Sequence, residues 1–186
     1  FFFDLCGGTR CILTECKRSD QALFDWYTSI SEGGSRHELG IKEQVAQAKQ
    51  DFPNRGAARW HLCISHAKRI SINRREMLRQ KPAEGAVFYS RVAAPGMTSA
   101  PQDMWLWPGC QLFACTRSVI KDLRNGMLYN VDKVGETTTL KGIDATLTKE
   151  EVSKYMRPSF AQTFASSQGL TLEGRVQLCD SAHRHF

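Results

Sequence analysis

The segment that decides the fold runs over residues 159–171 and reads Ser-Phe-Ala-Gln-Thr-Phe-Ala-Ser-Ser-Gln-Gly-Leu-Thr. Phe160 and Phe164 stand four residues apart, as on one face of a helix. Pro158 suits the first position of a helix, and Gly169 suits the residue after its end. The pattern predicts a short buried helix whose C-terminal end offers small polar donors to a sugar-phosphate backbone, namely Thr163, Ser166, Ser167 and Gln168. A capped core helix with an exposed polar turn is the alternative that the pattern leaves open.

A second informative segment, residues 13–20, reads Leu-Thr-Glu-Cys-Lys-Arg-Ser-Asp. Residues 9–14 predict a short strand, and Ser19 suits the N-cap of a following helix. An arginine between a strand and a helix lies where α/β sheets place ligands, and its rigid fork of donors matches phosphate. Two interpretations remain open, since Arg18 either contacts a phosphate or pairs with Asp20 or solvent.

A third segment predicts a strand over residues 60–65 and a helix over residues 66–80, with Ile70, Met77 and Leu78 toward the core. Ser65 would stand at the helix N-terminus, where anions bind, and His66 would be placed to stack on a base. The helix carries the densest basic run of the chain: Lys68, Arg69, Arg74, Arg75, Arg79 and Lys81. Such a run indicates salt-sensitive phosphate contacts or, alternatively, a solvated helix face.

Residues 105–157 alternate short apolar runs with turns, and Asn125-Gly126 is a strong hairpin signal. We interpret this stretch as a small β-barrel-like insertion between residues 1–104 and 158–186. Trp105 and Trp107 flank its beginning. They are expected in the barrel core, with base stacking as the alternative.

Composition limits the classes of protein that fit. Hydrophobic residues make up 41% and charged residues 24% of the 186 residues, and the net charge of +6 favours polyanionic partners. No apolar run approaches the roughly 20 residues that span a bilayer, so no membrane partner is expected. The seven cysteines form no Cys-x-x-Cys pair. They predict reduced thiols, no metal site and an intracellular location, nuclear or cytoplasmic.

Taken in order, these segments resemble the superfamily 1 DNA helicases of the RecD/Pif-type branch. Residues 159–171 resemble motif V, which usually reads Thr-x-His-Lys-Ser-Gln-Gly-x-Thr; Ala165 and Ser166 replace its His-Lys pair. Residues 13–20 resemble motif IV, and residues 62–73 resemble a family stretch of strand, Thr/Ser-x and a helix ending in Ile-Asn. Residues 109–127 resemble the Gly-x-x-Val-Met-x-x-x-Asn segment with its downstream Asn-Gly, although the second glycine of that region is absent.

The resemblance implies an α/β fold, namely the second RecA-like motor domain of the P-loop NTPase type, with a Src-homology-3-like barrel inserted over residues 105–157. It implies that Arg18 reaches the γ-phosphate of ATP as an arginine finger, and that Gln168 and Gly169 couple the nucleotide to DNA. It also implies 5′-to-3′ movement. The implied DNA-binding residues are Ser65, His66, Lys68, Thr163, Ser166, Ser167 and Thr171. ATP with Mg²⁺ and single-stranded DNA are the implied cofactors and partners.

The chain contains no Gly-x-x-x-x-Gly-Lys-Ser/Thr loop. The resemblance assigns that loop, and the acidic Mg²⁺ site, to a first RecA-like domain. We therefore expect a fragment of a longer ATP-dependent helicase, truncated before the last motif and unable to hydrolyse ATP alone. Two alternatives remain: a non-catalytic nucleic-acid-binding module from a decayed or mobile-element helicase, and a basic α/β interaction domain with no nucleotide role.

Overall fold

The computed structural model describes residues 19–53, 56–92, 101–116 and 121–180. The chain divides into two compact units, Phe1–Arg55 and Gly56–Phe186. Arg18 and the strand predicted over residues 9–14 lie outside the described residues. None of the helices in the described ranges combines the length and apolar character needed to cross a membrane.

The first unit contains helices α2 (Gln21–Ile30) and α3 (Ile41–Asp51). The predicted N-cap Ser19 is wrong by one residue, because the Asp20 carboxylate accepts the N–H of Leu23 at 2.8 Å. Asp is as good a cap as Ser, and it places the acceptor one residue closer to the apolar face. The α3 helix begins with the Glu43 carboxylate accepting the N–H of Gly40 at 3.0 Å.

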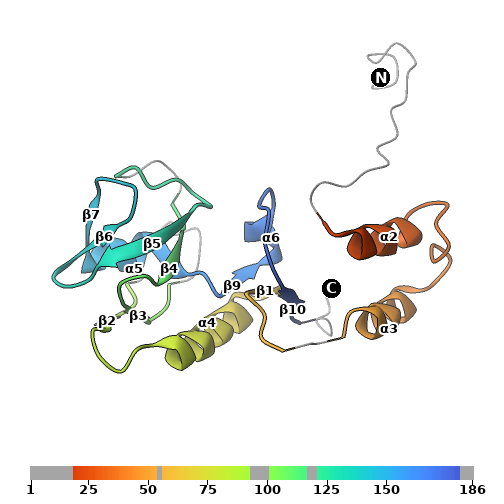
Figure 1. Ribbon diagram of the computed structural model, residues 1–186, viewed down its shortest axis with the longest axis horizontal. Coiled ribbons are helices and arrows are strands. Elements are labelled where there is room, and N and C mark those ends of the chain that lie inside the picture. The colour runs from red at the N-terminus through yellow and green to blue at the C-terminus, as the bar shows by residue number, and fades with distance from the viewer. Residues whose placement is uncertain (1–18, 54–55, 93–100, 117–120, 181–186) are drawn as a thin grey trace, which may run out of the picture. The chain divides into compact units, whose positions relative to one another are not determined.

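A parallel sheet forms one part of the second unit (Figure 1). Its strands are β1 (Trp60–Cys63), β9 (Ala161–Thr163) and β10 (Val176–Leu178), in the order β10-β1-β9. Both neighbours run parallel to β1, and Cys63 is the partner of Thr163. Every residue of β1 is buried, as expected for the central strand of a parallel sheet.

Helix α4 (His66–Gln80) packs against this sheet and has the predicted bounds. Its predicted core face is partly wrong, because Leu78 is 51% exposed. The helix is rotated so that Asn73, which is fully buried, reaches β9. The Asn73 amide donates to the carbonyl of Ala161 at 3.2 Å, and its oxygen accepts the N–H of Ala161 at 2.7 Å. This pair of hydrogen bonds decides which face of α4 is buried.

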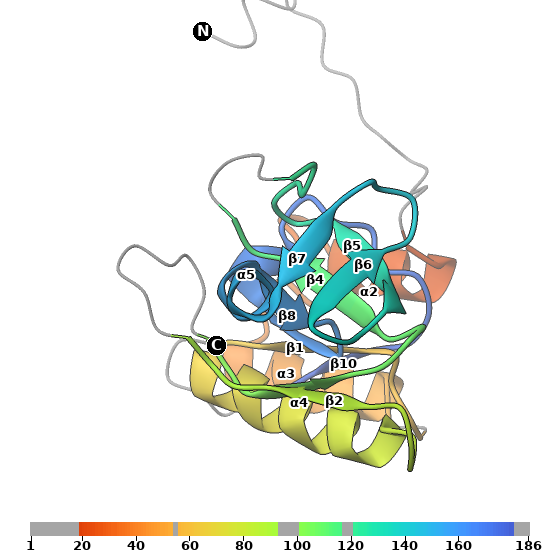
Figure 2. The same ribbon diagram turned by 90° about the vertical axis from the view of Figure 1, so that its left-hand side faces the viewer.

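The rest of the second unit is antiparallel. Strands β2 (Val87–Tyr89) and β3 (Met104–Leu106) pair with each other, and a five-stranded sheet has the order β7-β6-β5-β4-β8. Figure 2 shows β4, β5, β6 and β7, with helix α5 beside β7. The bounds of these elements are β4 (Gln111–Ala114), β5 (Leu128–Lys133), β6 (Thr137–Leu140), β7 (Thr146–Thr148), α5 (Lys149–Tyr155) and β8 (Met156–Pro158).

The predicted hairpin signal at Asn125-Gly126 lies in the turn that leads into β5. The N–H of Met127 donates to the carbonyl of Arg124 at 3.1 Å, and Gly126 has φ +82°, which suits glycine.

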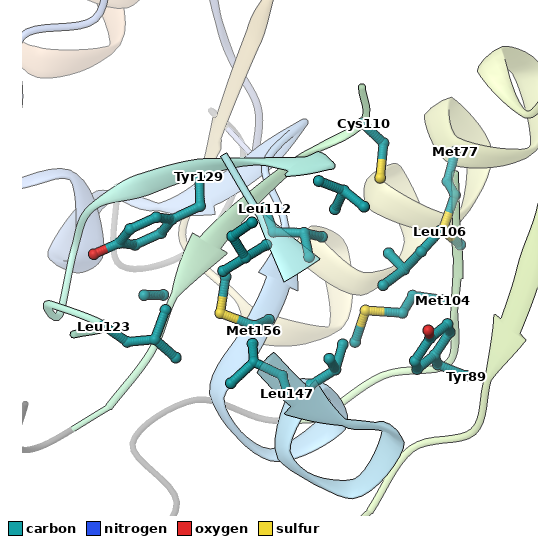
Figure 3. Packing of buried hydrophobic residues seen from close by; sticks show 14 residues of the cluster. Met77, Tyr89, Met104, Leu106, Cys110, Leu112, Leu123, Tyr129, Leu147 and Met156 are labelled. Atoms are coloured by element: carbon teal, nitrogen blue, oxygen red, sulfur yellow. The ribbon is translucent and has the colours of Figure 1, made fainter. Parts of the chain in front are cut away.

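The hydrophobic core of the second unit lies between the antiparallel strands, α4 and α5 (Figure 3). The buried phenol of Tyr89 contacts the hydroxyl of Thr138 at 2.7 Å, so its polar end is satisfied inside the core. Trp105 and Trp107 are partly buried and pack against this core. The core residues labelled in Figure 3 are Met77, Tyr89, Met104, Leu106, Cys110, Leu112, Leu123, Tyr129, Leu147 and Met156.

The segment over residues 159–171 is not one helix, so that prediction is wrong. Pro158 ends β8, an edge strand where its missing N–H costs no hydrogen bond. Strand β9 follows, and only Phe164–Ser167 form a helix, α6. Pairing of β9 with buried β1 overrides the helical spacing of Phe160 and Phe164.

Candidate functional site

The carboxyl ends of β1 and β9 bring two predicted segments to one edge of the parallel sheet. Each strand leads into a helix: Ser65 is the N-cap of α4, and Thr163 is the N-cap of α6. The Ser65 hydroxyl accepts the N–H of Lys68 at 3.1 Å. Because Cys63 and Thr163 are strand partners, the two helix beginnings lie at the same edge, where α/β sheets place ligands.

The hydroxyls of the polar turn hold the turn itself. The N–H of Thr163 donates to the hydroxyl oxygen of Ser166 at 3.1 Å, and the N–H of Ser166 donates to that of Thr163 at 3.3 Å. The Ser167 hydroxyl donates to the carbonyl of Phe164 at 2.9 Å. Thr163 therefore begins α6 instead of ending a helix, and direct contact of these hydroxyls with DNA stays a prediction.

Gln168 and Gly169 complete the turn. Gly169 has φ +82°, a conformation that other residues adopt only with strain. The N–H of Leu170 donates to the carbonyl of Ser167 at 3.0 Å, which closes the chain on itself. Gln168, Gly169 and Thr171 are exposed, so their side chains or backbone are accessible to a ligand.

A pocket of about 530 Å³ lies beside this turn. The described residues that line it come from α4, the turn before β5, the end of β4 and the segment from β8 to Leu170. Five predicted site residues line it: His66, Thr163, Ser166, Gln168 and Gly169. The described residues that line the pocket do not include Ser65, Lys68, Ser167 or Thr171.

Two buried arginines also line the pocket. Arg157, which was not predicted as a site residue, is 2% exposed; Arg69, from the basic run predicted either to contact phosphates or to face solvent, is 4% exposed. Arg157 donates from Nη1 to the carbonyls of Ser153 at 2.8 Å and Met156 at 2.6 Å. A signal that could have found Arg157 is its position two residues before the decisive segment.

The pocket is electropositive. Burial, together with the smaller effect of the Arg69 charge, lowers the pKa of Arg157 to about 10. Burial also lowers the pKa of the Arg69 guanidinium. The pKa of His66 is lowered below 6.5, first by burial and then by the charges of Arg69 and Arg157. The charge of Arg69 therefore acts on both Arg157 and His66, and all three side chains line one pocket.

The Ser65 side of the edge has an acidic neighbour. The Asp180 carboxylate accepts the N–H of Ile64 at 3.3 Å and the N–H of Ser65 at 3.5 Å. This carboxylate makes the Ser65 side less favourable for a phosphate than the pocket side. Within the described ranges, no group of three or more His, Cys, Asp or Glu residues is arranged to hold a metal ion.

The combination of a parallel strand–helix layer and an antiparallel sheet is a mixed α/β fold, and solved Pif1 helicase structures have a similar fold. The chain superposes on Bacteroides Pif1 bound to ssDNA with a TM-score of 0.54 and 15% identity, over 88% of this chain and 43% of that one. A structure of two Pif1 helicases coordinating at forked dsDNA gives a TM-score of 0.54 and 16% identity, over 88% and 41%. Bacteroides Pif1 in complex with ADP-AlF3 and ssDNA gives a TM-score of 0.52 and 16% identity, over 88% of this chain and 44% of that one.

The predicted resemblance to superfamily 1 helicases of the Pif type is thus confirmed at the level of the fold. The chain spans less than half the length of these structures. No protein-family model matches the chain. No curated protein matches its sequence either.

Proposed function

We propose that this chain is the second motor domain of an ATP-dependent DNA helicase and that it binds single-stranded DNA along the carboxyl edge of β1 and β9. One observation carries the proposal. The pairing of Cys63 with Thr163 puts the Ser65–His66 junction and the polar turn at the same edge. The fold in which they meet is shared with Pif1 structures that are bound to ssDNA.

In this proposal the residues at the edge contact different parts of the single-stranded DNA. His66 is exposed and free to stack on a base, while Lys68 neutralises a phosphate. Thr163 and Ser166 fix the shape of the turn, so that Gln168 and the backbone at Gly169 meet the sugar-phosphate chain. Ser65, Ser167 and Thr171 complete the predicted set of contacts.

The finer architecture is part of the same proposal. Residues 1–104 and 158–186 would form the RecA-like domain, and residues 105–157 would form a Src-homology-3-like barrel. The five-stranded order β7-β6-β5-β4-β8, with its antiparallel pairs, supports the second assignment. Within the described part of the chain Cys63, Cys110 and Cys179 are free thiols, which supports an intracellular location in a reducing nuclear or cytoplasmic compartment.

The nucleotide side of the proposal depends on residues beyond this chain. ATP and Mg²⁺ would be held mainly by a first RecA-like domain, and Mg²⁺ neutralises charge on the phosphates. This chain would contribute Arg18, which lies outside the described residues, and the turn at Gln168 and Gly169. Because the chain lacks a phosphate loop, the purified chain should not hydrolyse ATP in amounts comparable to the amount of protein.

A non-catalytic nucleic-acid-binding module is the second candidate. Ala165 and Ser166 stand where the resembling helicases carry His-Lys, and Ala165 is exposed at the turn. Loss of these basic side chains favours a module that has kept its fold and lost its coupling. The two candidates differ upstream, since an intact phosphate loop in the parent protein supports the motor.

The test is fluorescence-anisotropy binding of the chain to a labelled single strand at low and moderate salt. Replacing Thr163 and Gln168 together by alanine should weaken binding about fivefold to tenfold, because two hydrogen-bonding side chains are lost. The matched control replaces Thr137 and Gln80, which are exposed away from the turn. Binding that is equally strong in both double variants would contradict the proposed path and favour the basic face of α4.

A further inference from the structure

We propose that the pocket beside the polar turn is a phosphate-binding pocket, in which Arg69, Arg157 and Gln162 hold one phosphate group of a nucleic acid. The source of that phosphate rests on the proposed function, whereas the affinity for phosphate does not. This pocket adjoins the exposed edge and shares Thr163, Ser166, Gln168 and Gly169 with it, whereas Ser65 and Lys68 are not among its described lining residues.

The first argument is charge. Arg69 and Arg157 are both buried and both line this pocket, and the described lining also contains His66 but no carboxylate. Keeping two guanidinium groups out of bulk water is unfavourable, and nearby anionic groups offset that cost. Arginine is also the side chain whose fork of donors matches a phosphate. The pocket therefore has the positive charge and the type of side chain that suit a phosphate group.

The second argument is an unsatisfied amide. Gln162 lies in β9, lines the pocket and is only 3% exposed. Among the described residues, neither its Nε2 nor its Oε1 has a hydrogen-bond partner. A buried amide without partners is rare in folded proteins because it loses its hydrogen bonds to water. A phosphate in the pocket would accept the Nε2 hydrogens and so satisfy the donor half of this amide.

The third argument is space. A volume of about 530 Å³ exceeds what a phosphate alone fills and suits a small organic ligand. Phe113, Pro158 and Leu170 give the pocket an apolar wall. Ala165 and Ser166 have small side chains and leave its rim open, where the resembling helicases carry His-Lys. The ligand class is therefore a phosphate ester with an attached sugar or base.

Occupancy of the pocket can be read at Cys115, which lines it and is half-buried. The full chain is treated with iodoacetamide with or without inorganic phosphate, at constant ionic strength set with chloride, and alkylation is mapped by mass spectrometry. Phosphate should slow alkylation of Cys115 and leave Cys179, a half-buried thiol that is not among the described lining residues, unchanged. Equal rates at Cys115 with and without phosphate would overturn the proposal.

Variants separate a ligand-binding role from a structural one. Arg157→Met removes the charge at similar volume but leaves the carbonyls of Ser153 and Met156 without their donor, so the folding of this variant is checked first. Protection by phosphate should weaken about tenfold or more, because charge-assisted hydrogen bonds are lost. Arg74→Met removes the same charge from an exposed position on α4 and should keep full protection.

Gln162→Leu keeps the test decisive if Arg157→Met fails to fold. Replacing an amide without partners by leucine should preserve or raise the unfolding temperature and lower protection of Cys115. Loss of stability together with full protection by phosphate would show that Gln162 is purely structural and would overturn its assignment.

Oligonucleotides then identify the source of the phosphate. Protection of Cys115 by an unphosphorylated oligothymidylate would assign an internal phosphodiester, and protection only by the 5′-phosphorylated form or by thymidine monophosphate would assign a terminal phosphate. Protection by inorganic phosphate but by none of these would overturn the nucleic-acid source. A chain that binds phosphate but no single-stranded DNA would contradict the proposed function and leave the phosphate pocket standing, so failure of one proposal can be told from failure of the other.

Discussion

Replacing Asn73 by alanine should weaken the attachment of β9 to α4. The Asn73 side chain is fully buried and makes two hydrogen bonds to the backbone of Ala161 and one to the side chain of Gln102. In the variant, the N–H and the carbonyl of Ala161 lose these partners, and water has little access because Ala161 is 2% exposed.

The magnitude follows from the two backbone groups left unpaired. Each costs about 1–3 kcal/mol when buried without a partner, so we expect a loss of about 3 kcal/mol in the free energy of unfolding. For a chain of this size that loss lowers the unfolding temperature by roughly 6–12 °C. Because β9 leads directly into the cap at Thr163, single-strand binding should weaken as well.

Urea unfolding followed by tryptophan fluorescence measures the loss in the free energy of unfolding, because the second unit contains Trp60, Trp105 and Trp107. Asn130→Ala is the control, because Asn130 is exposed on β5 and its loss should stay within about 0.5 kcal/mol. A loss below about 1 kcal/mol for Asn73→Ala would refute the reasoning that two orphaned backbone groups result.

Two further predictions concern the polar turn and the pocket. Gly169 and Gly142 both have φ +82°, and at neither position would a new Cβ meet a heavy atom. Gly169→Ala and Gly142→Ala should therefore each lower the free energy of unfolding by about 1 kcal/mol, measured by urea unfolding. Only Gly169→Ala should weaken single-strand binding, and equal losses of binding in the two variants would contradict a role for the turn. In NMR titrations the pKa of His66 should lie below 6.5 and rise toward 6.5 in Arg157→Met, because one of the repelling charges is gone. Because the pKa of His66 is lower in the folded chain than in the unfolded chain, the unfolded chain binds this proton at a higher pH. Protonation of His66 should therefore lower the free energy of unfolding as the pH falls below about 6.5. A His66 pKa that is unchanged in Arg157→Met would contradict the electropositive pocket.

The sequence predicted α4 well because the signals for that helix are local. An apolar strand, the cap Ser65 and a periodic helix follow one another, and the observed helix has the predicted bounds. The turn at Asn125-Gly126 was also predictable, since that dipeptide favours positive φ. Such elements depend on neighbours in the chain.

The decisive segment was assigned wrongly because its structure depends on a distant strand. The spacing of Phe160 and Phe164 fits a helix, but pairing with β1 makes residues 161–163 a strand. The buried arginines were missed for a related reason. Arginine is rarely buried, so Arg69 was placed on an exposed basic face, open to phosphate or to solvent, and Arg157 was not considered. Only the fold shows that these two side chains share a cavity.

Strands β8 and β9 belong to different sheets, yet only Ser159 and Phe160 separate them. Both linking residues are anchored, since the Ser159 hydroxyl donates to the carbonyl of Gln111 at 3.1 Å and the carbonyl of Phe160 accepts the N–H of His61 at 3.0 Å. So short and well-held a connection has almost no slack. A force applied to the antiparallel sheet, such as a strand of DNA or a partner pulling on its surface, would reach the turn at Thr163 through the chain itself.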